Sequence, residues 1–475
     1  MTIKLNRLKW GLTVASVVAL SACASFDIQK GLDRATQDTK ELTQSDLQLA
    51  RTDSERQKQQ VISTQILARQ LGSAEAVQLM LANSPAFQAL MAQNWFEAAS
   101  MAQSGRIANP VFSYESVVTG TETEINRFLT FGLLDLLTLP QRSAIAEYRI
   151  EQAQLRLASE VIDRVTQVKQ AWVNAVAAEQ SLAYAQQVYE SAQASAELAR
   201  RMEAVGNFNR LTRARHQAFY ADAATQRVTA KQNAVSKRED LVRQLGLNLE
   251  QAQMLTLPSR LPELPKQPMS DEDVGRQASR NRLDVQLAKA TLNAAAKAQG
   301  LVGITSLTDI EVSARKGTVS DSGTGTTTSR HGYEVGVRLP IFDWGSMQRD
   351  AMNAQMLAAA NSLEATVRAA GSGLRESYSA YRSAYDISRH YKDEVLPLRK
   401  VMADENILRY NGMIIGVFEL LADARDQVST VMSAISADQQ FWIADAALRA
   451  NLMGRPTAVG LSAVSSTASS AVINH

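Results

Sequence analysis

The sequence predicts an internally duplicated α+β fold in which very long helices follow short pairs of strands. Three observations support it: similar segments recur about 200 residues apart, two helical patterns run for about sixty residues, and short alternating segments precede each of them. The 475 residues carry 50 Lys and Arg against 48 Asp and Glu. This balance gives no indication of a nucleic-acid partner.

The duplication rests on several short matches in the same order, separated by a proline-rich connector. Residues 257–270 hold four prolines, which exclude a regular helix and favour an extended linker between repeats at 71–256 and 271–453. The matching pairs are 83–88 with 281–286, 139–140 with 339–340, and 211–217 with 421–427.

Each repeat is expected to contain a leading helix, two strands, a very long helix, a tip and a shorter returning helix. The long helices would span about 142–203 and 344–410, roughly 90 Å each, with a bend at Pro397. Their apolar residues recur in steps of four and three, which is coiled-coil spacing. The leading helices (74–105, 272–300) would stack end to end with the returning helices (208–245, 417–453).

The four expected strands have the length and alternation of tilted transmembrane strands, which need about ten residues. They are predicted at 109–117, 126–133, 309–315 and 333–339, with loops at 119–124 and 319–330. Soluble hairpins are the alternative. Four strands cannot close a barrel, and open edges cannot face lipid. Two chains would supply about eight strands, and three would supply about twelve, enough to hold a channel.

A strand-to-helix junction is predicted in each repeat. Pro340 lacks an N–H and would end the strand ladder, Asp343 would cap the next helix, and Gly345 would allow close packing. Pro140 is the matching proline of the first repeat. At these positions the barrel would continue as a helical tube.

The N-terminus predicts export and a lipid anchor. Three cations precede a short apolar run, and residues 20–23 read LSAC, so 1–22 resembles a lipoprotein signal peptide with Cys23 as the lipid-bearing residue. An ordinary signal with an incidental Cys is the alternative. Residues 23–70 are expected to form an extended, lipid-anchored segment along the outside. The Ser- and Ala-rich tail 454–475 is expected to be disordered.

Taken together, these segments resemble the TolC-like outer membrane efflux family. The resemblance is carried by the LPIFDWG segment at 339–345, the NSP segment at 83–85, the tips at Gly206 and Gly412, the LLADAR segment at 420–425 and the duplication. It implies a homotrimer with a twelve-stranded β-barrel in the bacterial outer membrane lipid, continued by a long α-helical coiled-coil periplasmic duct. It also implies a periplasmic adaptor, an inner membrane pump and no cofactor apart from the lipid on Cys23.

Two kinds of site are predicted near the tips. Family members narrow the duct with acidic side chains after the second tip, and here Glu419 and Asp423 lie four residues apart on one helical face. Exposed acids at a helix start are the equal alternative. Apolar side chains beside tip glycines favour adaptor contact, although Phe208 could equally pack within its own hairpin. The candidate contact residues are Gly206, Phe208, Gly412, Met413 and Ile414.

The sequence contains no catalytic motif, and it predicts a passive exit channel, not an enzyme. The four His residues are scattered, and each is expected on the solvated surface. No metal site is expected. A duct for protein secretion and a lipid-anchored coiled coil without a pore are the two other hypotheses, and the strand pairs argue against the second.

Overall fold

The structure, a computed structural model, describes residues 27–278, 282–305 and 309–456. The expected signal peptide, Cys23 and residues 457–475 lie outside this part of the chain. The chain divides into two compact units. The first contains residues up to Ala35, Met91–Leu157 and Asp284–Arg368, and the second contains Thr36–Leu90, Ala158–Leu283 and the chain from Ala369 onward.

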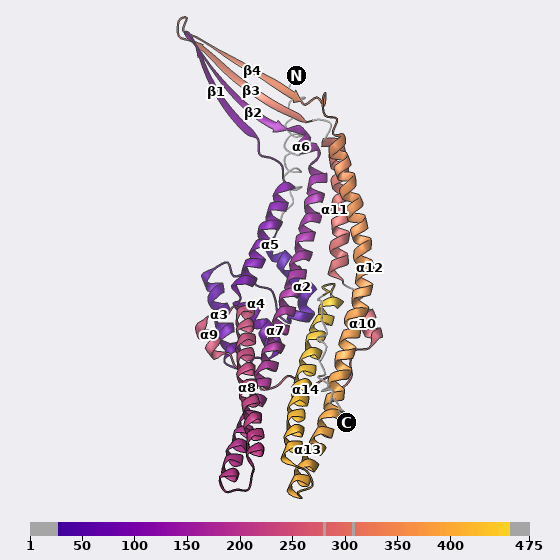
Figure 1. Cartoon of the computed structure of the whole chain (residues 1–475). Coiled ribbons are helices and arrows are strands. Elements are labelled where there is room, and N and C mark those ends of the chain that lie inside the picture. Colours follow the sequence, from indigo (N-terminus) through magenta and orange to yellow (C-terminus); the bar gives the residue numbers. More distant parts are fainter. Residues whose placement is uncertain (1–26, 279–281, 306–308, 457–475) are drawn as a thin grey trace. The chain divides into compact units, whose positions relative to one another are not determined.

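The first unit carries a four-stranded antiparallel sheet in the order β1-β2-β3-β4, visible at the top of Figure 1. The strands are β1 (Val111–Thr119), β2 (Glu122–Gly132), β3 (Ile310–Asp321) and β4 (Thr326–Val337). The two strand pairs come from the two repeats and join through the β2–β3 ladder.

The predicted strand pairs exist, but their loops were predicted too long. Only residues 120–121 and 322–325 lie between the paired strands. The Ser- and Thr-rich run from 319 to 330, expected as a loop, is mostly strand. Thr suits a pleated surface, and the Ser320 and Thr327 hydroxyls lie 2.9 Å apart across the β3–β4 pair. A glycine, Gly325, occupies the left-handed turn position with φ +65°.

Helices, most of them long, make up the rest of the first unit. It contains α6 (Leu133–Leu137), α11 (Leu283–Thr305), most of α5 (Pro85–Ser104) and the first parts of α7 (Leu139–Ala204) and α12 (Ser346–His390). Buried amides join these helices: Asn94 Nδ2 of α5 donates to the Ala153 carbonyl of α7 at 2.7 Å, and Gln152 Nε2 of α7 donates to the Ala290 carbonyl of α11 at 3.1 Å.

The two strand-to-helix junctions differ. After β2 the short helix α6 intervenes, and Pro140 is the second residue of α7, where its missing N–H costs no helical bond. After β4, residues 338–345 form an irregular connection. Asp343 does not cap α12 as predicted; its Oδ1 accepts the Gly345 N–H at 2.8 Å and closes a turn just before the helix. Gly345 has φ +68°, which favours glycine.

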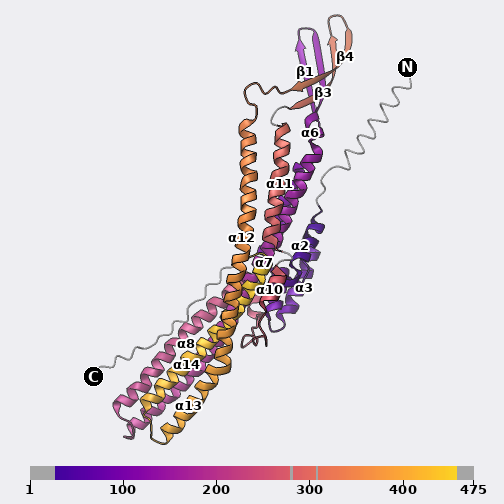
Figure 2. The same cartoon turned by 90° about the vertical axis from the view of Figure 1, so that its right-hand side faces the viewer.

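The second unit is built around two helical hairpins, with the remaining small helices beside them. The first hairpin pairs the end of α7 with α8 (Arg210–Leu245), and the second pairs α13 (Leu396–Asn411) with α14 (Val417–Leu452). Figures 1 and 2 show both hairpin tips at the same end of this unit. The small helices are α3 (Asp53–Leu67), α4 (Ser73–Asn83), α9 (Leu249–Met254) and α10 (Asp271–Ala278).

Each predicted leading helix is two helices, and the end of the returning helix meets the point where the second of them begins. The first is broken at Ser84, whose extended backbone (ψ 115°) precedes Pro85. The C-terminal end of α8 meets this break: a Cβ on Gly246 would lie 2.7 Å from Ser84 Cα. In the second repeat the Leu283 N–H, at the start of α11, donates to the Met453 carbonyl after α14 at 3.0 Å.

The N-terminal segment is helical, which corrects the expectation of an extended chain. Helix α2 (Ile28–Thr43) and α3 account for most of residues 27–70. A capping box, in which Thr52 and Glu55 each bond the other's backbone, begins α3. These caps were readable in the sequence, because Thr52 is followed three residues later by Glu55.

The second long helix is irregular just before Pro397, the position of the predicted bend. Helix α12 ends at His390, a π-helical turn η1 (Tyr391–Val395) follows, and α13 begins at Leu396. Pro397 has no N–H to donate to the preceding turn, so the backbone there cannot keep a regular α-helical ladder. The first long helix has no internal proline and is continuous over 66 residues.

The coiled-coil spacing predicted on α7 marks the core of the second unit. The residues at these steps are all buried: Val161, Val165, Val168, Trp172 and Ala175. An aromatic cluster of Tyr381, Tyr385 and Phe441 packs α12 on α14, with ring centroids 5.5–5.7 Å apart between Phe441 and each tyrosine. None of the helices in the described ranges has an apolar stretch sufficient to cross a bilayer.

Candidate functional site

The sheet has one largely apolar face, and that face is exposed within the chain. Directly paired residues share a face, so the ladder places Phe112 beside Leu129, Leu129 beside Ala314, and Ala314 beside Tyr333. Tyr333 is 87% exposed, and Phe112 is 64% exposed. A sheet with an uncovered aromatic face requires an apolar environment or a partner surface.

The opposite face of the sheet is polar and internally bonded. Asn126 is buried at its centre and donates to Glu115 Oε2 at 3.2 Å. Arg315 donates to Asn126 Oδ1 at 2.9 Å and to Glu124 Oε1 at 3.0 Å. Gly317 leaves room for this network, because a Cβ there would lie 2.7 Å from Asn126 Oδ1. The alternation predicted from the sequence therefore separates an apolar face from a hydrogen-bonded polar one.

Both outer strands leave an edge without a partner within the described sheet. Strand β1 pairs only with β2, and β4 pairs only with β3. Every residue of β1 and β4 is exposed. Unpaired edges of this length bind another strand readily.

The tip of the first hairpin is closed by a left-handed glycine and by side-chain bonds. Gly206 has φ +79°, and the next N–H, of Asn207, bonds the Met202 carbonyl at 2.8 Å. Phe208 is half-buried and stacks on His216 with ring centroids 6.0 Å apart. This contact fits the alternative in which Phe208 packs within its own hairpin.

His216 is not a solvated surface residue, contrary to the sequence prediction. Its Nδ1 lies 2.7 Å from Ser195 Oγ, and its Nε2 is buried without a hydrogen-bond partner in the described part of the chain. Burial lowers the pKa of His216 below its ordinary value. The imidazole is therefore part of the packing that joins α7 to α8.

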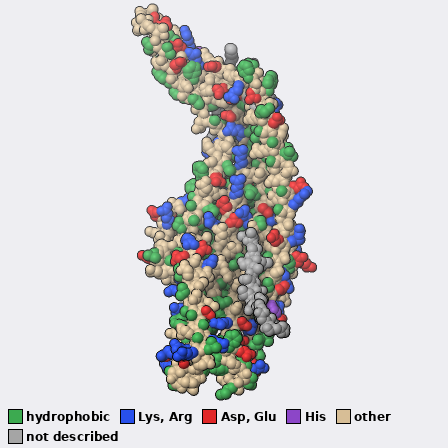
Figure 3. Space-filling view, in the orientation of Figure 1, with side chains coloured by type: hydrophobic (Ala, Val, Ile, Leu, Met, Phe, Trp, Pro, Cys, Tyr) green, Lys and Arg blue, Asp and Glu red, His purple; other side chains and the backbone are tan. Residues whose placement is uncertain are grey.

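The surface near the first tip is basic. Figure 3 shows blue side chains gathered at the lower left, over this hairpin. Arg200 and Arg201 both bond Glu197, and these bonds lower the pKa of that carboxyl to about 2. Arg213 pairs with Glu203 at 2.7 Å and ties α8 back to α7.

The tip of the second hairpin uses a different residue for the same turn. The left-handed position is occupied by Met413, with φ +58°, whereas Gly412 has φ −78°. The Ile414 N–H bonds the Arg409 carbonyl at 2.8 Å, as Asn207 bonds Met202 in the first tip. Met413 is 93% exposed, and Ile414 is 75% exposed. The predicted residues of this tip are thus exposed, and the left-handed residue is Met413, not the tip glycine Gly412.

The two predicted acids lie in the first turns of α14. Glu419 is exposed, and Asp423 is half-buried on the same helical face. Neither carboxylate forms an ion pair with any residue in the described ranges. The next acid along the helix, Asp426, lies 3.9 Å from Arg399. The structure therefore leaves both candidate acids available without placing them against another group.

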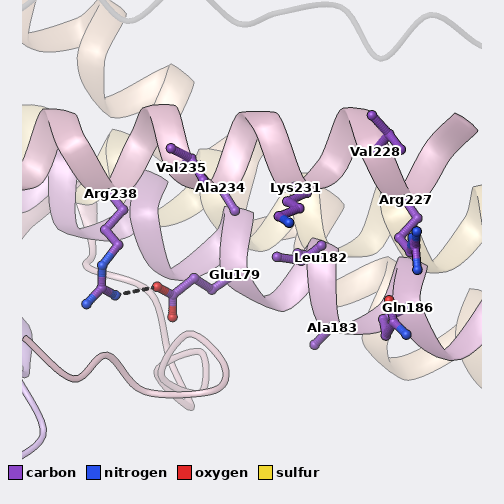
Figure 4. A pocket seen from close by; sticks show the side chains of 10 residues that line it. All are labelled: Glu179, Leu182, Ala183, Gln186, Arg227, Val228, Lys231, Ala234, Val235 and Arg238. Atoms are coloured by element: carbon purple, nitrogen blue, oxygen red, sulfur yellow. Dashed lines mark hydrogen bonds and ion pairs between the residues drawn. The ribbon is translucent and has the colours of Figure 1, made fainter. Parts of the chain in front are cut away.

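A groove of about 840 Å³ lies between α7 and α8 of the first hairpin, seen in Figure 4. Its floor is apolar, with Leu182 and Ala234, and Lys231 lies between the two ends. One end is bounded by the Arg238–Glu179 ion pair at 2.8 Å, and Arg227 bounds the other. Sequence reasoning did not identify this groove, because no local motif records how two helices diverge.

No group of three or more potential metal-ligating side chains occurs in residues 27–278, 282–305 and 309–456. The residues that stand out are instead arranged along the sheet faces and the hairpin tips. Such an arrangement provides surfaces and edges at which another chain can bind.

Comparison with known proteins agrees with this reading. Residues 274–455 match the outer membrane efflux protein family. The resemblance predicted from the sequence is confirmed for this region. No curated protein sequence is similar enough to the chain to count as a relative.

Solved structures extend the likeness in fold to most of the chain. The outer membrane channel CmeC of Campylobacter jejuni is 14% identical, with a TM-score of 0.69, 83% of this chain covered and 86% of that chain. VceC of Vibrio cholerae is 14% identical, with a TM-score of 0.67 and coverages of 84% and 98%. The open state of the Neisseria gonorrhoeae MtrE channel is 18% identical, with a TM-score of 0.63 and coverages of 81% and 90%. The mostly helical fold with a small antiparallel sheet is therefore that of outer membrane channels.

Proposed function

We propose that this chain is the outer membrane channel of a tripartite efflux system, passively conducting substrates delivered by a periplasmic adaptor and an inner membrane pump. The observation that carries the proposal is the sheet, which exposes an apolar face and leaves both edges unpaired. A lone four-stranded sheet of this kind is stable in a bilayer only if other strands close it.

Three copies would complete the barrel. If β4 of one copy pairs with β1 of the next, a homotrimer has about twelve strands and no open edge. The apolar face would then contact lipid, and the Asn126–Arg315 network would line the interior. Alternating apolar-out and polar-in faces are what a transmembrane barrel needs. The family match at residues 274–455 and the likeness to solved channels support this assembly.

The hairpins would form the periplasmic duct, and their tips would meet the adaptor. Met413 and Ile414 are exposed apolar side chains at a tip, which favours a contact surface. Glu419 and Asp423 carry unpaired charge close to that tip. In a trimer they would place up to about six carboxylates around the axis, and such a ring attracts cations and repels anions.

The lipid on Cys23 belongs to the same proposal and has its own test. Labelled palmitate should enter the wild-type precursor and should be absent from Cys23→Ser. Equal label in both proteins would assign the lipid to another residue and remove the anchor from the proposal.

The experiment for the main proposal is the mass of the detergent-extracted protein, measured by light scattering and corrected for bound detergent. Three chains that also conduct ions in a planar bilayer are expected. A stable monomer would contradict the shared barrel and favour a lipid-anchored coiled coil without a pore. A conducting trimer that associates with a secretion ATPase and not with an efflux pump would favour the protein-secretion alternative.

A further inference from the structure

Three basic side chains form a row across the apolar face of the sheet. Arg127 of β2 is paired with Lys316 of β3, and Lys316 is paired with His331 of β4. Tyr114 of β1 stands opposite Arg127 and completes the row. Adjacent strands lie about 4.8 Å apart, so the side chains are immediate neighbours. We call Arg127, Lys316 and His331 the basic row.

The basic row lacks the compensation that charges on the other face receive. Cations directly opposite each other destabilise a strand pair unless an anion separates them. No side chain in the described ranges bonds or pairs with Arg127, Lys316 or His331. By contrast, Arg315, one residue before Lys316, is paired with Glu124 on the polar face. An external anion would compensate the basic row.

The row marks a border in composition. Toward the ends of the strands that connect to helices, the same face carries Phe131, Val312, Tyr333 and Val335. Toward the strand–strand turns six of its eight positions carry hydroxyl side chains, and the other two are Val118 and Ile125. The six hydroxyl residues are Ser116, Thr123, Thr318, Ser320, Thr327 and Ser329. The basic row separates the two zones.

The position of the border matches the edge of a membrane. An outer membrane barrel has an apolar band about 25 Å tall, which roughly ten residues of a strand tilted by about 40° span at 3.3 Å per residue. His331 lies six residues before the end of β4 at Val337, which accounts for about 15 Å of that height. The exposed residues Ile341 and Phe342 of the irregular connection continue the apolar surface beyond the strand. The basic row would then stand at the outer border, with the hydroxyl zone beyond it.

We propose that the basic row binds the phosphate groups of a phosphorylated glycolipid in the outer leaflet. Guanidinium and ammonium groups donate charge-assisted hydrogen bonds to phosphate oxygens, and the adjacent hydroxyl side chains suit a sugar headgroup. The inference rests on the proposed function, because it needs the apolar face in lipid and the helices on the periplasmic side. It adds a ligand class and named residues to that function.

The test is a titration of the detergent-solubilised full chain with hexa-acylated lipid A carrying both phosphates, followed by thermal unfolding. The wild-type midpoint should rise with lipid, and Arg127→Gln/Lys316→Gln should need on the order of tenfold more lipid for the same rise. Lys316→Gln alone should show a smaller loss. The matched control is Arg330→Gln, an exposed cation on the neighbouring register position of the opposite face, which should behave as wild type.

Two reagents and one readout make the outcome decisive. The same lipid with both phosphates removed, and inorganic phosphate alone, should leave the wild-type midpoint unchanged. An equal rise with either reagent, or an equal rise in the double variant, would overturn the phosphate-lipid assignment. Bilayer conductance separates this result from the proposed function. If the wild type and the double variant both conduct and respond equally to the lipid, only the basic-row proposal is rejected. If the wild type does not conduct, the proposed channel function itself is rejected.

Discussion

The two hairpin tips form the same turn but are stabilised by different contacts. In the first, a glycine takes the left-handed position, Asn209 caps α8 through its side chain, and Glu203–Arg213 ties the helices together. In the second, Met413 takes that position, and the cap residue Gly416 offers no side chain. The duplication has kept the topology of the tip while its local stabilisation has diverged.

The difference extends along the hairpins. The first is cross-linked at Tyr189–Tyr220, with hydroxyls 3.2 Å apart, and at Ser195–His216. In the described part of the second hairpin, the side-chain pair between α13 and α14 that lies nearest the tip is Arg399–Asp426, at 3.9 Å. The π-helical turn before α13 adds a second irregularity. Within its own hairpin the second tip is therefore the less restrained, and it is the tip with unpaired acids. Its remaining tie is to the first hairpin, because Arg425 of α14 pairs with Asp222 of α8 at 2.9 Å.

Substituting the left-handed residues should have the largest effect on the difference in local stability between the two tips. Gly206→Ala places a side chain in a left-handed position and should lower the local stability of the first tip by about 1–2 kcal/mol. Met413→Gly should raise that of the second by about 0.5–1 kcal/mol, because Met413 packs against little. Hydrogen exchange of the tip amides measures both. Gly412→Ala, at φ −78°, is the control and should change little; a loss equal to that of Gly206→Ala would contradict the assignment of the turn.

Acidification should loosen the first tip selectively. Burial lowers the pKa of His216, and the groups that face it, Ser195 and Phe208, are uncharged. The folded hairpin binds this proton less readily than the unfolded chain. The stabilisation is therefore complete above pH 6.5, the ordinary value, and is lost as the pH falls below it.

Hydrogen exchange at pH 7.5 and 5.5, corrected for intrinsic rates, tests this expectation. Protection at the first tip should fall at most a few-fold, because solvent screens a half-exposed group. The second tip serves as an internal reference. His216→Gln should abolish the difference between the two pH values; a difference that persists would assign the pH response to another group.

Neutralising the acids of the second tip should alter ion selectivity. Glu419→Gln/Asp423→Asn should lower the cation preference of the reconstituted channel by a few-fold, because the proposed ring loses its charge. Asp271→Asn/Glu272→Gln, in the first turn of α10, is the matched control with two exposed acids. Unchanged selectivity in Glu419→Gln/Asp423→Asn, or an equal change in the control, would remove these acids from the constriction.

Periodicity predicted the architecture because long elements leave long signals. The buried positions Val161 to Ala175, the strand pairs and the irregular turn before Pro397 follow from spacing and proline chemistry. The predicted loops were too long, because the Ser- and Thr-rich run at 319–330 pairs across the end of β3 and the start of β4. The prediction of an extended N-terminal segment was wrong, because the capping box of Thr52 and Glu55 begins a helix there.

The details of the sites depend on contacts that one segment cannot reveal. A glycine at a tip favours left-handed backbone there, but the hydrogen bonds of the second tip place Met413, not Gly412, in that conformation. His216 was predicted on the solvated surface because the sequence does not show that Phe208 and Ser195 lie against it. The basic row depends on the register of three strands from both repeats, and no linear motif encodes it.

The smallest expected effect isolates the ion pair that ties the first tip. Arg213 Nη1 lies 2.7 Å from Glu203 Oε2, but the two side chains are 52% and 22% exposed, so solvent screens their attraction. Arg213→Gln should lower the local stability of the first tip by about 0.2–1 kcal/mol. In a double-mutant cycle with Glu203→Gln, most of that loss should appear as coupling between the two residues. Arg210→Gln, an exposed cation at the start of α8, is the control. If Arg213→Gln costs no more than Arg210→Gln, the glycine turn and the His216 packing alone restrain the first tip, and the contrast with the second tip reduces to those two features.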